Sequence, residues 1–103
     1  MKSSLVVPAF MLALAATPAL AVVGGGDVTF TVKGAGNVVF SHEMHVSDMG
    51  QKCRECHPRI FLDSRRSKHV TMKAMGKGKS CGACHNGKKA FSVKGDCAKC
   101  HRK

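Results

Sequence analysis

Apolar and polar residues alternate strictly along one short stretch near the start of the chain, from Val28 to Lys33. This alternation predicts a half-buried strand, because successive side chains of a strand point to opposite faces. Residues 34–37 contain two glycines and an asparagine and predict a turn, after which Val38–Phe40 returns as a second strand. An isolated hairpin is marginal in water, so this one requires an apolar surface to lie on.

Helical patterns farther along the chain are short. Ser41 is a suitable N-cap for a helix that runs to about residue 49. Another helix is expected to start at residue 67 or 69 and to end at Met75, before a glycine-rich turn, and a further one is expected after Cys97. The remainder after residue 51 is rich in Gly, Lys and Ser and predicts loop. The expected fold is therefore a small, loop-rich α+β chain with an N-terminal two-stranded hairpin and a few short helices.

The first 21 residues have the features of a secretory signal peptide. Lys2 gives a positive start, residues 5–14 are apolar apart from Pro8, and the Ala-Leu-Ala sequence that ends at Ala21 is a cleavage signature. An uncleaved membrane anchor is the alternative, but a membrane span takes about 20 consecutive apolar residues. We predict cleavage before Val22, a flexible lead-in at 22–26, and one soluble domain at 27–103 with no stable membrane insertion.

The mature chain has few large apolar residues from which to build a core. Removal of 21 of the 103 residues leaves 82, with no Trp or Tyr and four phenylalanines, Phe30, Phe40, Phe61 and Phe91. Chains this small bury little surface and usually need disulfides, metals or another crosslink. We therefore expect something other than side chains to fill the interior.

The chain is strongly basic. It has 17 Lys and Arg against 6 Asp and Glu, a formal net charge of +11 that falls to +10 when Lys2 leaves with the signal peptide. Such a charge is typical of proteins that bind nucleic acid or anionic membranes. An exported protein rarely meets nucleic acid, however, and no nucleic-acid-binding module is present in the sequence, so no nucleic-acid partner is expected.

All six cysteines lie in three Cys-x-x-Cys-His motifs, at residues 53–57, 81–85 and 97–101. Two thiols at this spacing can add to the two vinyl groups of one heme, and the adjoining histidine then coordinates its iron. The sequence thus predicts three covalently bound c-type hemes (heme c). The attachment residues would be Cys53, Cys56, Cys81, Cys84, Cys97 and Cys100, and the proximal iron ligands would be His57, His85 and His101.

Three other uses of paired cysteines compete with heme attachment. A four-thiolate zinc site could use the first two pairs, but it would leave the third pair and every following histidine unexplained. A disulfide scaffold also fails to explain three histidines at identical offsets. A thioredoxin-like redox site needs one such pair in a βαβ context, which the sequence lacks.

The remaining histidines and two methionines are candidates for the sixth ligand of each iron. His42 and His45 lie three positions apart on a predicted helix, so they project to neighbouring sides of one element and could ligate two different hemes. For the third heme the candidates are His69, Met72 and Met75. For the two methionines the competing use is packing at helical spacing.

The motifs and the Phe40–His45 sequence resemble those of triheme c7-type cytochromes, a class III multiheme family. The stretch from Cys81 to Phe91 is especially similar to c7-type domains, and the resemblance covers about residues 27–103. It implies that His42 pairs with His57 on the first heme and that His45 pairs with His85 on the second. Where simple family members have a histidine for the third heme, this chain has Met75; a His/Met branch of the family then implies pairing of Met75 with His101.

The resemblance implies a periplasmic electron carrier between inner-membrane oxidoreductases and outer-membrane or extracellular acceptors, not an enzyme. Two further hypotheses remain: a terminal reductase of metal ions or a small oxyanion, and a subunit of a polymeric cytochrome assembly. We expect a monomer whose partners are other redox proteins, acidic or multiheme. Basic side chains that would stabilise heme propionates or steer such partners are Lys77, Lys79, Lys88, Lys89, Lys94 and Lys99.

Overall fold

The computed structural model describes residues 16–17 and 21–102 of the chain. The predicted signal peptide, residues 1–21, therefore lies almost wholly outside the described residues and stays a prediction. None of the helices within the described ranges is long and apolar enough to cross a membrane.

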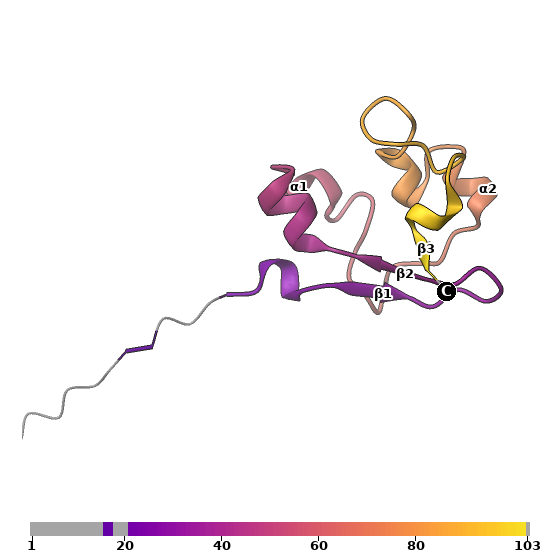
Figure 1. Cartoon of the computed structure of the whole chain (residues 1–103). Coiled ribbons are helices and arrows are strands. Elements are labelled where there is room, and N and C mark those ends of the chain that lie inside the picture. The colour runs from indigo at the N-terminus through magenta and orange to yellow at the C-terminus, as the bar shows by residue number, and fades with distance from the viewer. Residues whose placement is uncertain (1–15, 18–20, 103) are drawn as a thin grey trace, which may run out of the picture.

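A three-stranded antiparallel sheet forms one side of the molecule (Figure 1). Strand β1 (Val28–Phe30) pairs with β2 (Asn37–Phe40), with Thr29 opposite Val39. The chain end returns as β3 (His101–Arg102), which pairs with the other edge of β2. The predicted hairpin is thus confirmed, and the last Cys-x-x-Cys-His motif is joined directly to it.

The hairpin has the predicted alternation but is shorter than expected. Val28 and Phe30 are half-buried and Thr29 is exposed, and β2 alternates in the same way. The first strand was expected to reach Lys33 but ends at Phe30. The backbone N–H of Val32 donates to the Asn37 side chain, 3.1 Å away, so it serves the turn.

The helices are all short. A π-helical segment, Glu43–Asp48, lies where the first helix was expected, and the Ser41 hydroxyl accepts from the Met44 N–H as a cap would. Helix α1 (Cys53–Cys56) and helix α2 (Met72–Met75) are single turns. Three 3-10 turns complete the list: Val23–Gly25, Ser80–Ala83 and Cys97–Lys99.

Two of these elements differ from the expectation. Helix α2 starts at Met72 and not at residue 67 or 69, because Ser67 accepts a hydrogen bond from the Leu62 N–H in the preceding loop. Thr71 caps the helix instead, accepting from the Ala74 N–H. The lead-in at 22–26, expected to be flexible, contains a 3-10 turn that packs against the π-helical segment.

Side chains do not build a hydrophobic core in the described part of the chain. No hydrophobic side chain there is buried, and Gly82 is the one residue classed as buried. Several large apolar side chains are about half exposed or more, among them Met44, Met49 and Val39. The small α+β fold is confirmed, and its large apolar side chains are left partly exposed in the described part of the chain.

Candidate functional site

Each Cys-x-x-Cys-His motif begins with one helical turn. The first motif forms α1, and the other two lie on the 3-10 turns Ser80–Ala83 and Cys97–Lys99. A single turn brings side chains three positions apart to the same side of the backbone. In the first two motifs the backbone N–H of the histidine donates to the backbone carbonyl oxygen of the first cysteine, at 2.8 Å for His57 and 2.9 Å for His85. The two thiols and the imidazole of a motif are therefore presented together.

The three motifs are neighbours in space. Burial raises the pKa of the Cys56 thiol, and the nearby Cys84 thiol raises it further. Burial likewise raises the pKa of Cys100, with an added contribution from Cys81. The second motif therefore lies near both the first and the third.

The structure describes all six cysteines. All six cysteines are free thiols in the structure. Among the residues that the structure describes, which include every cysteine and histidine, no group of three His, Cys, Asp or Glu side chains is arranged to hold a metal ion.

Five of the six histidines share one arrangement: the Nδ1 atom of the ring lies within hydrogen-bond distance of a backbone carbonyl oxygen. The Nδ1–oxygen pairs are His42 with Gly26 (2.6 Å), His45 with Ser41 (2.8 Å), His57 with Phe61 (2.8 Å), His85 with Phe91 (2.9 Å) and His101 with Gly36 (2.9 Å). His69 has no such bond among the described residues and is exposed.

These hydrogen bonds fix the tautomer of each ring. A carbonyl oxygen can only accept, so Nδ1 must carry the proton, and the lone pair is left on Nε2. Metal-binding histidines typically donate their other ring N–H to a carbonyl or a carboxylate, which orients the ring and raises its basicity. The five histidines thus have the arrangement of metal ligands, and they are the five that the sequence predicts as ligands.

The imidazole rings of His45 and His85 lie close together. Their ring centroids are 6.3 Å apart and the ring planes are inclined by 69°. Two imidazoles on opposite sides of one metal atom, each with a metal–nitrogen bond of about 2.0 Å, have centroids roughly 6.4 Å apart. The observed spacing fits an iron held between His45 and His85.

The Phe40 ring contacts both candidate distal ligands, His42 and His45. Its ring packs edge-on against His42, with centroids 5.0 Å apart, and is tilted against His45 at 4.3 Å. The sequence shows Phe40 beside these histidines but does not show that it touches both. A residue at the end of β2 thus contacts two histidines that are expected to ligate different hemes.

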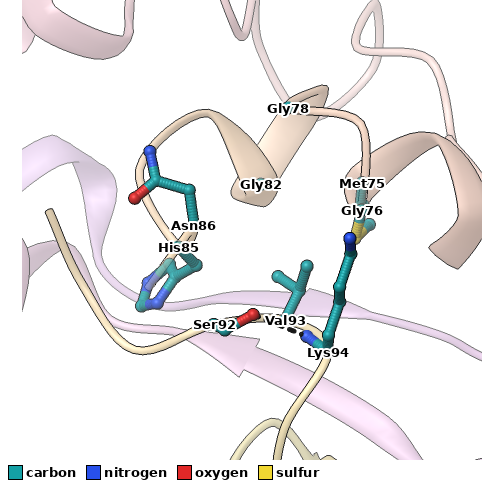
Figure 2. A pocket seen from close by; sticks show the side chains of 9 residues that line it. All are labelled: Met75, Gly76, Gly78, Gly82, His85, Asn86, Ser92, Val93 and Lys94. Carbon is teal, nitrogen blue, oxygen red and sulfur yellow. Dashed lines mark hydrogen bonds between the residues drawn. The ribbon is translucent and has the colours of Figure 1, made fainter. Parts of the chain in front are cut away.

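The structure places the methionine candidates beside the second motif. Met75 is half-buried and ends α2, whereas Met72 is 47% exposed. Figure 2 shows Met75 and His85 on two sides of a pocket that Gly82 and Val93 also line. Ligation of the third heme by Met75, and its pairing with His101, stay predictions.

Gly82 allows α2 to approach the second motif closely. A Cβ atom at this position would lie 1.8 Å from the carbonyl oxygen of Met75, a distance that no two such atoms can occupy. Glycine is therefore required at the second position of this motif. The sequence shows the glycine but not the backbone that it contacts.

A groove with basic walls lies between the loop after the first motif and the start of the second. Ile60, Phe61 and Leu62 supply apolar surface, and the basic residues along it are Arg59, Arg66, Lys68 and Lys79. Arg66 is also paired with Asp63, and this hydrogen bond lowers the pKa of the Asp63 carboxyl group. An apolar surface with a basic margin suits a ring system that carries carboxylates, as heme does.

Comparison with known proteins identifies the family. A family model described as cytochrome c7 and related cytochrome c matches residues 38–102. A solved c7-type three-heme cytochrome domain is 51% identical, with a TM-score of 0.68, over 74% of this chain and 91% of that one. The C-terminal hexaheme fragment of GSU1996 is 52% identical, with a TM-score of 0.67, over 73% of this chain.

The N-terminal hexaheme fragment of the same protein is 53% identical, with a TM-score of 0.64, over 74% of this chain. The matched region covers 46% of each hexaheme fragment, so this chain spans about half of either. No match was found among the curated proteins.

Proposed function

This chain belongs to the cytochrome c7 family, and from that premise we propose that it is a periplasmic electron carrier with three covalently bound c-type hemes. The observation that carries the proposal is the shared state of five histidines, whose Nδ1 atoms all donate to carbonyls. Their Nε2 lone pairs are left for iron. Heme, when bound, supplies one-electron redox chemistry.

The proposed assignment divides the residues by role. The six cysteines form the thioether bonds, and His57, His85 and His101 are the proximal ligands. His42 and His45 are the distal ligands of the first and second hemes, and Met75 is the distal ligand of the third. The 6.3 Å spacing of His45 and His85 supports the second of these pairs.

Two protein ligands for each iron favour electron transfer over catalysis. A substrate cannot reach a six-coordinate metal unless it displaces a side chain, and these side chains are oriented by hydrogen bonds. Axial methionine raises the potential of a heme relative to a second histidine. The third heme should therefore have the highest potential, and the chain is proposed not to be an enzyme.

The charge of the chain supports a role in docking to acidic redox partners. Lys77, Lys79, Lys88, Lys89, Lys94 and Lys99 are exposed around the second and third motifs. Part of this charge would neutralise the heme propionates, and the rest would attract acidic partners through a long-range, salt-dependent field. Export by the predicted signal peptide would place this carrier in the periplasm, as a monomer between inner-membrane oxidoreductases and outer-membrane or extracellular acceptors.

Carbon monoxide binding and particle size test the proposal together. The purified ferrous protein should bind less than one carbon monoxide per ten hemes, an order-of-magnitude bound for six-coordinate iron, and should elute as a monomer. Ready binding of carbon monoxide or cyanide at one heme would favour a terminal reductase instead. Large assemblies that persist on dilution would favour a polymeric cytochrome.

A further inference from the structure

The glycines at 24–26 form a tight turn that lies against His42. Gly24, Gly25 and Gly26 have φ angles of +61°, +83° and +96°. This left-handed region is accessible to glycine at little cost and is strained for residues with a Cβ. The 3-10 turn Val23–Gly25 contacts the π-helical segment that follows His42. Three successive glycines therefore adopt a specific conformation here, and the place at which they do so is a candidate heme ligand.

Gly24 covers the face of the His42 ring. A Cβ atom at Gly24 would lie 2.4 Å from Cδ2, 2.6 Å from Cγ and 2.8 Å from Nε2 of His42. Nearly equal distances to three consecutive ring atoms place this point above the ring plane and not at its edge. Only a residue without a side chain fits there, and Gly24 itself does not lie in the plane of the Nε2 lone pair.

Two further contacts hold the His42 ring in place. The carbonyl oxygen of Gly26 accepts from His42 Nδ1 at 2.6 Å, and Phe40 packs edge-on at 5.0 Å. The other distal histidine, His45, donates its Nδ1–H to the carbonyl oxygen of Ser41, only four residues earlier in the chain. The ring of His42 instead depends on a partner 16 residues upstream, outside its own segment.

We propose that Gly24, through its contact with the ring, and Gly26, through its carbonyl oxygen, are positioning residues that hold the His42 imidazole in the orientation needed to ligate the first heme. This inference rests on the proposed function, since it takes His42 to be an iron ligand. A ligand that is already fixed in its bound orientation loses less conformational freedom on coordination. The first heme of this chain would thus depend on the residues just after the predicted cleavage site.

The variant Gly24→Ala tests this proposal, and Gly25→Ala is its matched control. Both substitutions place a Cβ at a positive φ, but nothing lies within 4 Å of a Cβ at Gly25. The difference between the two variants therefore isolates the contact with the His42 ring. His42→Ala serves as the reference for complete loss of this ligand.

Three quantities should be measured on each mature holoprotein: the heme count by intact mass, the fraction of hemes that bind carbon monoxide in the ferrous form, and the reduction potentials. For Gly24→Ala we expect three hemes, about a tenfold rise over wild type in carbon monoxide binding, confined to one heme, and a shifted potential of that heme. Gly25→Ala should match the wild type in all three. Equal behaviour of the two glycine variants would overturn the proposal.

The His42→Ala variant distinguishes a failure of this inference from a failure of the proposed function. If His42→Ala does not create a carbon monoxide site, His42 is not a ligand and the proposed ligation is wrong. If His42→Ala creates one but Gly24→Ala does not, the positioning role alone is wrong. Should Gly24→Ala not accumulate, deletion of residues 22–26 removes the same contacts without adding a clash. That deletion should open the same heme, and a wild-type response would contradict the inference.

Discussion

The imidazoles of His45 and His85 lie 6.3 Å apart, centre to centre, although one follows β2 and the other ends the second Cys-x-x-Cys-His motif. Each ring is fixed by its own carbonyl, from Ser41 and Phe91 respectively. The backbone thus holds the two ring centres at a separation compatible with one iron atom between them.

Replacement of one histidine of this pair should leave one heme iron without its sixth ligand and should not change the ligation of the other two hemes. For His45→Ala we expect one of the three hemes to become five-coordinate and high-spin in the ferric form, and to bind carbon monoxide when reduced. Optical and electron paramagnetic resonance spectra measure the change. The control is His69→Ala, because His69 is exposed and lacks the hydrogen bond to a carbonyl. A fully low-spin His45→Ala protein would refute the pairing.

Met75, at the end of α2, should raise the reduction potential of the one heme that it ligates. Met75→His is expected to lower the potential of one heme by roughly a hundred millivolts or more, a fraction of the ~0.8 V range over which axial ligands act. It should also abolish the sulfur-to-iron charge-transfer band. Met72→Leu, a change at an exposed position on the same helix, should preserve this band. The assignment of Met75 is wrong if the wild type lacks the band or if the band survives in Met75→His.

Because α2 packs closely on the second motif, we expect that even a small side chain at Gly82 destabilises the protein. Gly82→Ala would direct a methyl group into the carbonyl oxygen of Met75, so the backbone would have to move. We expect a loss of about 1–3 kcal/mol in the free energy of unfolding, typical of overpacking, and weaker ligation by Met75. Chemical denaturation followed by the heme absorbance measures the first effect. Gly95→Ala is the control, since its Cβ would make only an ordinary contact, 3.5 Å from Ser92.

The absence of buried hydrophobic side chains in the described region predicts that the polypeptide does not fold without its hemes. A chain in which all six cysteines are replaced by alanine should show the circular dichroism of an unfolded protein and rapid amide exchange throughout. The matched control is the holoprotein under the same conditions. Cooperative thermal unfolding of the six-alanine chain would show that side chains suffice to form the fold.

The sequence predicts the hairpin and the Ser41 cap because both depend on interactions between residues close together in the chain. The alternation of residues 28–33 and the hydroxyl of Ser41 act over a few residues. The exact end of β1 was not predictable in this way, because Asn37 competes for the N–H of Val32. Strand β3 has only two residues, and its pairing of His101 with Val38 arises from a contact across most of the chain.

The candidate site also has features that the sequence predicts and features that only the fold determines. The spacing of the cysteines and histidines predicts heme attachment from the chemistry of one motif, and the family model and the solved c7-type domain support it. The partners of the ring nitrogens were not predictable, because backbone carbonyls are present at every position and only the fold selects which one faces a given histidine. For the same reason the glycine run at 24–26 indicated flexibility, whereas the structure packs it on His42.

The most direct test of the central claim is the intact mass of the purified mature protein, recorded together with the optical spectrum of its ferric form. We predict a mass equal to the polypeptide from Val22 plus three hemes, no free thiols, and a low-spin spectrum. A colourless protein, or one whose cysteines are free, cystine-linked or bound to zinc, would contradict the account.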